Sequence, residues 1–471
     1  MPDKDLLKHR RRNLLILLGP GILALLLTIL AGPPQPRNPG ISSLRWQTVA
    51  PVVAVVLLAG GALLHWKAVS DFVAGHRSYW KTVLFITTAI AGGVAIPLMA
   101  AEWAAGRYLA ATSQRTVPIF PPYAKVSFRT SEYTYTAEAN SMGFRDRETG
   151  PKSGFRIIAL GDSFTYGWGV ELADSWPKVL ERLCREHGGR VEVLNLGCPG
   201  ASVDVYAEVA ERGIPLLKPD LVLVGVLQGE DLKQLDMGGT MERLAGPRWA
   251  LATVLARVIR PRPSTPSQVK DEWQRGVQMI QARLAPEERM RLEQLDPEVK
   301  AMFLAGDLSP HLLRDTLKHP DFLEFTLDPS QPEMQKASAT MTRCLQKIRQ
   351  AADRQGARVI VLSVPWAYVS ARAVATKRRL GFRVEDSVVR SDAPDEAIRA
   401  NCRTAGVEFH CFTERFREEC KRRNLFFEFD GHLNAEGYAL YGEEVCKLLL
   451  EQKLLPMDGS AAVANAPASD K

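Results

Sequence analysis

Hydrophobic and polar positions divide the chain into a strongly apolar first hundred residues and a longer part in which short apolar runs alternate with amphipathic segments. Three apolar stretches cover residues 13–31, 47–66 and 82–101, and none has a charged residue in its centre. Each is about the 20 residues that a helix needs to cross a bilayer. Buried core helices are the alternative, but three such stretches in succession, with charged or aromatic flanks, favour a membrane domain with three transmembrane helices at 1–104.

Basic residues before the first stretch set the expected orientation. They are Lys4, Lys8, Arg10, Arg11 and Arg12. Short loops rich in Lys and Arg stay in the cytoplasm, so the N-terminus is expected inside and everything after the third span outside, in the periplasm. A cleaved signal peptide also begins with basic residues, but here the apolar core is longer and no Ala-x-Ala site follows. We therefore expect a multi-pass protein of the inner, cytoplasmic membrane.

Beyond a linker expected at 105–150, apolar runs alternate with helical patterns. Helices are predicted at 176–187 and about 435–451, and strands at 155–160, 191–195, 221–226, 358–364 and 407–410. Strands that alternate with helices imply an α/β fold, with a parallel sheet covered on both faces. Ligands of such sheets collect at the carboxyl ends of the strands.

A long segment at about 232–336 separates the third and fourth predicted strands and is interpreted as a helical insertion. Amphipathic helices are expected at 273–284 and 285–295, and residues 249–259 are apolar enough to touch a bilayer surface. A lid, a membrane-docking element, an oligomer contact and a plain packing subdomain all remain open for this insertion. The tail at 453–471, rich in Ala, Ser and Asp, is expected to be disordered.

Composition excludes some classes of function. The formal net charge is +7, but five basic residues lie in the N-terminal tail and the others are spread out, so we expect no nucleic-acid partner. The seven cysteines include Cys402, Cys411 and Cys420, which are close enough in sequence to offer a disulfide, while Cys184 and Cys446 fit buried apolar positions. Without a Cys-x-x-Cys motif or a Cys/His cluster, neither a metal nor a cofactor is expected.

Two short motifs supply the chemistry. Gly161-Asp162-Ser163 follows the first predicted strand, and Asp430-Gly431-His432 lies near the C-terminus. Together they provide a hydroxyl nucleophile (Ser163), a base to take its proton (His432) and an acid to orient that base (Asp430). Alternatively, Asp430 and Asn434 are only turn and N-cap residues before the last helix.

These motifs resemble sequence blocks of the SGNH/GDSL hydrolase superfamily. Leu160–Val170 is similar to the first block, Asn195–Gly200 to the second and Asp430–Asn434 to the last. Asn140–Arg145 is similar to a segment that often precedes the serine in membrane-linked members. The resemblance implies a three-layer α/β/α sandwich, flavodoxin-like, around a five-stranded parallel sheet at 151–452, with esterase, lipase or acyl-transfer chemistry.

The third block departs from the family pattern. It normally reads Gly-x-Asn-Asp and its asparagine supplies an oxyanion-hole amide, whereas Gly225–Asp231 contains no asparagine. The resemblance implies that Gly200 donates a backbone N–H to the oxyanion. We expect the Gln228 side chain or the Gly229 backbone to replace the missing amide, because Glu230 cannot donate while it is ionised.

The last block departs in its spacing. The family's acid usually lies three residues before the histidine, whereas Asp430 lies two residues before His432. This Asp-x-His spacing resembles that of the polysaccharide O-acetyltransferase relatives.

Three functions follow as hypotheses. The first is a membrane-anchored, extracytoplasmic serine esterase or deacylase that acts on acylated glycans or lipids. The second is an O-acyltransferase that modifies a cell-envelope or secreted polysaccharide. The third is a non-catalytic binding or assembly module that keeps the fold but has lost its oxyanion hole. Glu230 in the third block favours it, whereas the retained Ser163, Asp430 and His432 argue against it. Protein partners are left undefined.

Overall fold

The protein is described from a computed structural model, which covers residues 122–236, 265–366 and 369–456, a short helical segment at 100–105 and positions 107, 117, 119 and 120. The chain divides into two compact units, Met1–Ala105 and Gly106–Lys471. The fold below is that of the second unit.

A parallel sheet organises this unit. Its strands are β3 (Phe155–Gly161), β4 (Val191–Gly197), β5 (Leu221–Leu227), β6 (Arg358–Val364) and β7 (Glu408–Cys411). They are ordered β4-β3-β5-β6-β7, and all neighbouring pairs are parallel. The five-stranded parallel sheet expected from the apolar runs is therefore confirmed.

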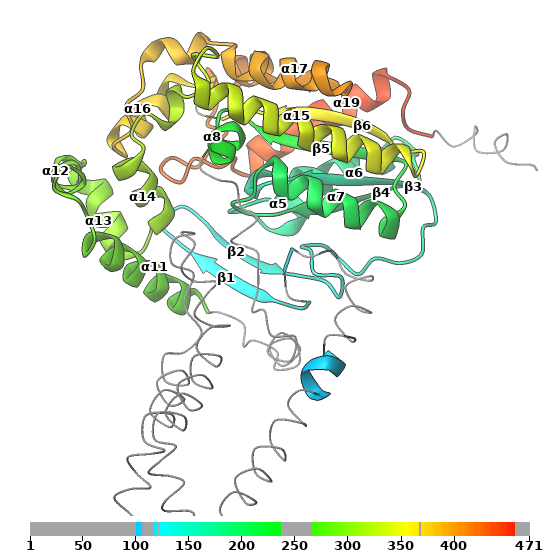
Figure 1. Cartoon of the computed structure of the whole chain (residues 1–471), viewed down its shortest axis with the longest axis horizontal. Helices are drawn as coiled ribbons and strands as arrows, with labels where there is room; N and C mark the ends of the chain where they lie inside the picture. Colours follow the sequence, from blue (N-terminus) through cyan, green and yellow to red (C-terminus); the bar gives the residue numbers. More distant parts are fainter. Residues whose placement is uncertain are drawn as a thin grey trace, which may run out of the picture. The chain divides into compact units, whose positions relative to one another are not determined.

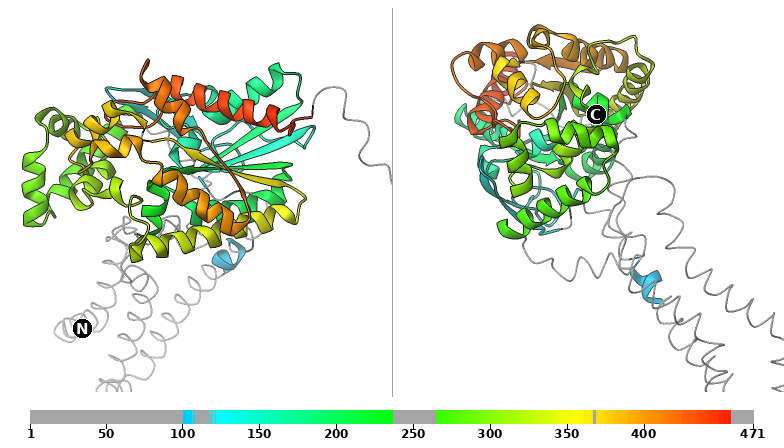
Figure 2. Two further views of the ribbon diagram at one scale, coloured as in Figure 1. Left: turned by 90° about the horizontal axis from the view of Figure 1, so that it is seen from above. Right: turned by 90° about the vertical axis from the view of Figure 1, so that its left-hand side faces the viewer.

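Helices cover both faces of the sheet, because successive strand residues point to opposite sides. In β3, Ile157 packs with α6 (Trp176–Glu186) and α19 (Ala435–Glu451), whereas Ile158 packs with α7 (Val203–Leu217), α15 (Pro332–Asp353) and α17 (Ala393–Ala405). Figure 2 shows the layers from above, with the red α19 on one side of the strands and the orange α17 and yellow-green α15 on the other. The architecture is an α/β/α sandwich.

Short helices surround this sandwich. They are α5 (Ser163–Tyr166), η1 (Leu172–Asp174), α8 (Glu230–Asp236), η2 (Phe322–Glu324), α16 (Ala371–Arg379), η4 (Asp386–Arg390) and α18 (Thr413–Cys420).

Part of the segment expected to be a linker, 105–150, is folded. Strands β1 (Lys125–Arg129) and β2 (Thr134–Glu138) form an antiparallel hairpin. Its aromatic residues pack into a small core: Phe128 stacks on Tyr135, with ring centroids 4.9 Å apart, and also contacts Trp168 and Trp273. Burial of these rings supplies the stability that an isolated hairpin lacks.

The insertion is helical; its first helix begins earlier than the expected 273–284, whereas its second lies within the expected 285–295. Its helices are α11 (Pro266–Gln281), α12 (Pro286–Gln294), α13 (Pro297–Ala305) and α14 (Pro310–Lys318), which gather at one end of the unit, with α11 beside β1 (Figure 1). Each begins with proline at its first position, where the missing N–H costs nothing. The apolar segment 249–259 lies outside the described residues.

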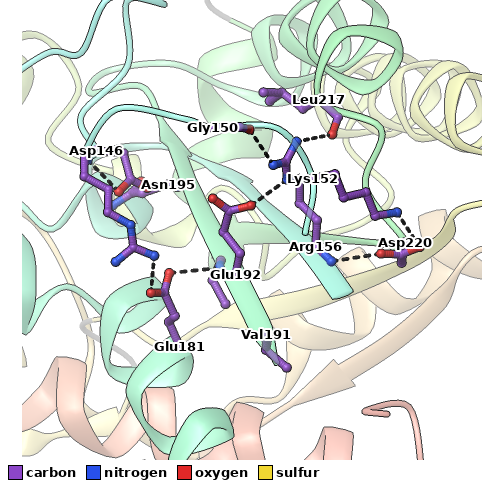
Figure 3. A network of polar contacts seen from close by, with 12 residues as sticks. Asp146, Gly150, Lys152, Arg156, Glu181, Val191, Glu192, Asn195, Leu217 and Asp220 are labelled. Carbon is purple, nitrogen blue, oxygen red and sulfur yellow. Dashed lines mark hydrogen bonds and ion pairs between the residues drawn. The ribbon is translucent and has the colours of Figure 1, made fainter. Parts of the chain in front are cut away.

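A network of polar side chains ties β3 and β4 together. Arg156 of β3 is buried, and its guanidinium donates hydrogen bonds to the Glu192 carboxylate and to the carbonyls of Leu217 and Gly150 (Figure 3). The backbone N–H of Arg156 donates to the Asp220 carboxylate. A buried guanidinium is tolerated only when its donors are satisfied, so this network fixes the end of the sheet opposite to the loops that follow the strands.

The structure does not test the expected membrane domain. Spans 13–31 and 47–66 and nearly all of 82–101 lie outside the described residues, as does most of the tail at 453–471. Within the part that is described, no helix combines the length and the apolar character that crossing a membrane requires. All seven cysteines are described and are free thiols, and Cys184 and Cys446 pack against each other with sulfurs 3.9 Å apart.

Gly197, the last residue of β4, leaves room for the backbone that follows the predicted nucleophile. A Cβ at Gly197 would lie 2.1 Å from the Tyr166 backbone nitrogen. We expect Gly197→Ala to destabilise the protein by at least about 2 kcal/mol, because the backbone has to move. Thermal unfolding of the full chain in detergent measures this, with Gly150→Ala, whose Cβ meets nothing within 4 Å, as the control. Equal midpoints for the two variants would contradict the expectation.

Candidate active site

Ser163 lies at the carboxyl end of β3, where the chain turns sharply into α5. Asp162 caps this helix by accepting a hydrogen bond from the Phe164 N–H. Gly161 allows the turn, since a Cβ there would lie 2.0 Å from the Thr165 hydroxyl oxygen. The short helix therefore holds the Ser163 side chain at the edge of the sheet, partly exposed to solvent.

The structure brings together the three residues that the two motifs predicted. His432 Nε2 lies 2.7 Å from Ser163 Oγ, across 269 residues of sequence, and His432 Nδ1 lies 2.5 Å from Asp430 Oδ1. With a proton on Nδ1, the imidazole donates to the carboxylate and Nε2 accepts from the serine hydroxyl. This is the arrangement in which a histidine removes the serine proton during attack.

Aromatic rings flank the imidazole. The His432 ring centroid lies 4.6 Å from that of Phe164 and 5.8 Å from that of Trp168. Both rings come from the segment that directly follows Ser163, so the nucleophile and the surroundings of its base are set by one stretch of chain.

Asp430 is held in its charged form. Burial alone raises the pKa of its carboxyl, but the charge and hydrogen bonds of His432, together with the Tyr133 hydroxyl, outweigh burial and leave the pKa below its usual value. The Tyr133 hydroxyl donates to Asp430 Oδ2 at 3.0 Å. An ionised acid beside Nδ1 stabilises the imidazolium that forms when serine is deprotonated.

Arg145, in the segment that the sequence placed before the serine, supports the nucleophile turn. Its guanidinium is buried and donates to the carbonyls of Tyr166, Gly167 and Val170. The next residue, Asp146, accepts from the Asn195 N–H of β4 and forms an ion pair with Lys178. Arg145 and Asp146 therefore join the loop after Ser163 to the neighbouring strand β4. This contact is the structural role of the Asn140–Arg145 segment, which the sequence alone showed only as a resemblance.

Gly200 and Gly229 follow the two strands that flank β3. Gly200 lies in the turn after β4, and Gly229 lies two residues after the end of β5, both with a left-handed backbone. Because all three strands are parallel, these turns lie at the same edge of the sheet as Ser163. Their place in the fold is compatible with backbone donors near the attacked carbonyl.

Gln228 does not serve as the expected oxyanion donor. Its side chain is buried, and its amide nitrogen donates to Asp395 Oδ1 and to Thr413 Oγ1, both at 2.8 Å. Its oxygen accepts from the Trp366 N–H. Both amide protons are therefore used inside the core, and the prediction for this side chain is wrong.

The next two residues of the third block, Glu230 and Asp231, make different contacts. Asp231 is buried and accepts from the Leu227 N–H and the Tyr206 hydroxyl, which closes the turn after β5. Glu230 accepts from the Gln234 side chain, and burial, together with the charge of Asp162, raises its pKa to about 7. The charge that His432 carries when it is protonated acts in the opposite direction and lowers the pKa of Glu230.

Sequence reasoning missed several residues of this site. Glu132, Tyr133 and Trp168 contact Asp430 or His432, and Lys377 of α16 is buried with its ammonium 5.1 Å from the Trp366 ring centroid. Only Trp168 stood in a recognised motif, and no local pattern marks the other three, since their partners are distant in sequence.

The model of the GDSL-like lipase/acylhydrolase family matches residues 159–320. No curated protein sequence matches the chain.

Solved structures that resemble the chain carry related names. A lipase/acylhydrolase from Enterococcus faecalis is 11% identical, with 64% of this chain and 97% of that chain covered and a TM-score of 0.32. A member of the lipolytic G-D-S-L family from Veillonella parvula is 14% identical, with 63% and 98% covered and a TM-score of 0.30. A catalytic mutant of an acetylxylan esterase from Geobacillus stearothermophilus is 11% identical, with 64% and 95% covered and a TM-score of 0.33.

The raised pKa of Glu230 gives a prediction for stability. Between the ordinary value of 4.5 and the folded value of about 7, the folded chain holds this proton more tightly than the unfolded chain, so Glu230 costs stability as the pH rises through that window. We expect Glu230→Gln to stabilise the protein at pH 8 by about 2 kcal/mol and to have little effect at pH 5. Thermal unfolding at both values measures this, and an equal gain at both would contradict it.

Proposed function

Since residues 159–320 match the model of the GDSL-like lipase/acylhydrolase family, we propose that the protein is a serine esterase or deacylase with Ser163 as its nucleophile. The contact between Ser163 Oγ and His432 Nε2 at 2.7 Å carries this proposal, because it pairs a hydroxyl at a strand end with a base that a carboxylate orients. The two residues are 269 positions apart in sequence, so only the fold brings them into contact.

The reaction follows from these positions. Ser163 Oγ attacks the acyl carbon while its proton passes to His432 Nε2, and the imidazolium is stabilised by Asp430. His432 then returns the proton to the oxygen of the leaving alcohol, and the acyl group stays on Ser163. Water, or the hydroxyl of an acceptor, then gives its proton to the same imidazole and attacks the acyl carbon. His432 returns that proton to Ser163 Oγ, which leaves as the free serine.

Backbone N–H groups are the proposed oxyanion donors. With the Gln228 side chain used in the core, the turns of Gly200 and Gly229 are left to stabilise the negative charge on the carbonyl oxygen. Loss of one oxyanion donor typically costs about a hundred- to a thousand-fold in rate. We therefore expect a working but slower enzyme than one with a complete set.

The substrate is proposed to be an acylated glycan or lipid. The match to the GDSL-like lipase/acylhydrolase family supports an acyl ester as the substrate.

The place of action is proposed to be the outer side of the inner membrane. Support comes from the three apolar stretches at 13–31, 47–66 and 82–101 and from the basic residues before the first. An anchored enzyme of this kind would meet its substrate in the cell envelope, where acylated glycans and lipids are found.

An O-acyltransferase is the second candidate. It uses the same residues and differs only in the acceptor, which is a sugar hydroxyl in place of water. The Asp-x-His spacing favours it, and in this chain that spacing still lets Asp430 reach His432 Nδ1. A degenerate binding module is disfavoured, because selection for binding alone does not require the contact between Ser163 and His432.

Labelling with a fluorophosphonate probe tests the nucleophile. We expect the full chain in detergent to be labelled, and Ser163→Ala and His432→Ala to lose labelling by at least a thousandfold, since the attacking oxygen or its base is gone. His187→Ala, an exposed histidine of the α6 C-terminus, is the matched control and should label like the parent. A folded parent that resists the probe would overturn the proposal.

Product analysis separates the two enzymes. With 4-nitrophenyl acetate as acyl donor, an esterase releases acetate at the same rate with or without a glycan oligosaccharide. A transferase places acetyl groups on the oligosaccharide, which mass spectrometry detects as an increase of 42 Da per group, roughly the mass of an acetyl group less one hydrogen. Ser163→Ala should abolish either product.

A further inference from the structure

A tight turn upstream of the hydrolase domain reaches the catalytic acid. The β1–β2 hairpin closes at Thr130–Tyr133, where the Thr130 hydroxyl oxygen accepts from the N–H groups of Glu132 and Tyr133. The Thr130 N–H also donates to the Tyr133 carbonyl at 2.9 Å. These bonds fix the turn, so the two side chains that it presents have defined positions.

Glu132 holds the backbone of the acid. One carboxylate oxygen accepts from the Phe429 N–H at 3.0 Å and the other from the Asp430 N–H at 2.8 Å. Both oxygens of one side chain thus bind two consecutive peptide groups. Such a pair of bonds fixes the direction of the loop at Asp430 as well as its position.

Tyr133 holds the carboxylate itself. Its hydroxyl donates to Asp430 Oδ2 at 3.0 Å and accepts from the Trp168 indole N–H at 3.0 Å. The other oxygen, Oδ1, faces His432, so the two carboxylate oxygens are bound from opposite sides. Burial raises the pKa of Tyr133 well above its usual value, and the hydroxyl therefore keeps the proton that it donates.

We propose that the Thr130–Tyr133 turn is a positioning element of the active site, in which Glu132 fixes the backbone of Asp430 and Tyr133 orients its carboxylate toward His432. The inference rests on the proposed serine chemistry. It assigns to Tyr133 and Glu132, which lie outside the segment that matches the family model, a role in the activation of Ser163.

The turn also sets the pH range in which the acid works. The titratable and charged groups that act on Asp430 come from several elements: His432 from its own loop, Glu132, Tyr133 and Tyr135 from the hairpin, Lys377 from α16 and Tyr438 from α19. The Tyr133 hydrogen bond lowers the pKa of Asp430. Loss of that bond therefore shifts the acidic limb of activity to higher pH.

Tyr133→Phe against Tyr135→Phe is the decisive comparison. Tyr135 lies in the same hairpin and is buried, and its hydroxyl has no hydrogen-bond partner among the described residues. We expect Tyr133→Phe to lower kcat and the rate of fluorophosphonate labelling by about ten- to a hundredfold, with KM little changed, because one hydrogen bond to a charged group is lost. Tyr135→Phe should match the parent.

The pH profile distinguishes positioning from a general loss of stability. Tyr133→Phe should shift the acidic limb of kcat/KM upward, whereas a variant that is only less stable keeps the limb in place. Equal rates and equal profiles for the two variants would overturn the inference. A parent that is not labelled would instead overturn the proposed function, so the two failures are distinguishable.

Variants of Glu132 test the other half of the turn. Glu132→Ala removes both acceptors and should lower labelling about tenfold or more, and Glu132→Gln, which keeps one carbonyl acceptor, should restore part of the rate. Glu138→Gln is the matched control, since Glu138 forms an exposed ion pair with Lys125 in the same hairpin. Equal labelling by Glu132→Ala and Glu138→Gln would contradict a role for Glu132.

Discussion

The direction of the strands is the constraint on which this site depends. All described strands of the main sheet run parallel, so every loop that leaves a strand emerges at the same edge. Ser163, Gly200 and Gly229 follow β3, β4 and β5 at this edge, and the last loop before α19 brings His432 to it. The topology of the sheet alone therefore brings the nucleophile, the base and the two glycine turns to one edge.

The fold and the nucleophile could be predicted because their signals are local. Strands buried on both faces leave unbroken apolar runs, and Gly161-Asp162-Ser163 records a turn that permits no side chain at its first position. The start of α11 was not predicted, because it is marked by the capping residue Thr265 and by Pro266 at the first position, and not by the amphipathic pattern.

The rest of the site could not be predicted, because it depends on partners far apart in the sequence. The side chain of a glutamine that follows a strand can point either toward the active site or into the core. That of Gln228 points into the core because it donates hydrogen bonds there to Asp395 and Thr413, which are 167 and 185 residues away in sequence. Likewise, nothing near Tyr133 in the sequence indicates that its hydroxyl meets Asp430, 297 residues later. A single sequence shows which side chains can form hydrogen bonds, but not which distant residues they bind.

The support that Arg145, Glu132 and Tyr133 give to the catalytic loops has a consequence for how this protein diversifies. All three precede the segment that the family model recognises, yet they bind the loops that carry Ser163 and Asp430. Recombination that exchanged only residues 159–320 would separate the loop of Ser163 from Arg145, which holds it, and from Asp430 and His432. The unit that evolution can transfer intact therefore extends from the hairpin to the last helix.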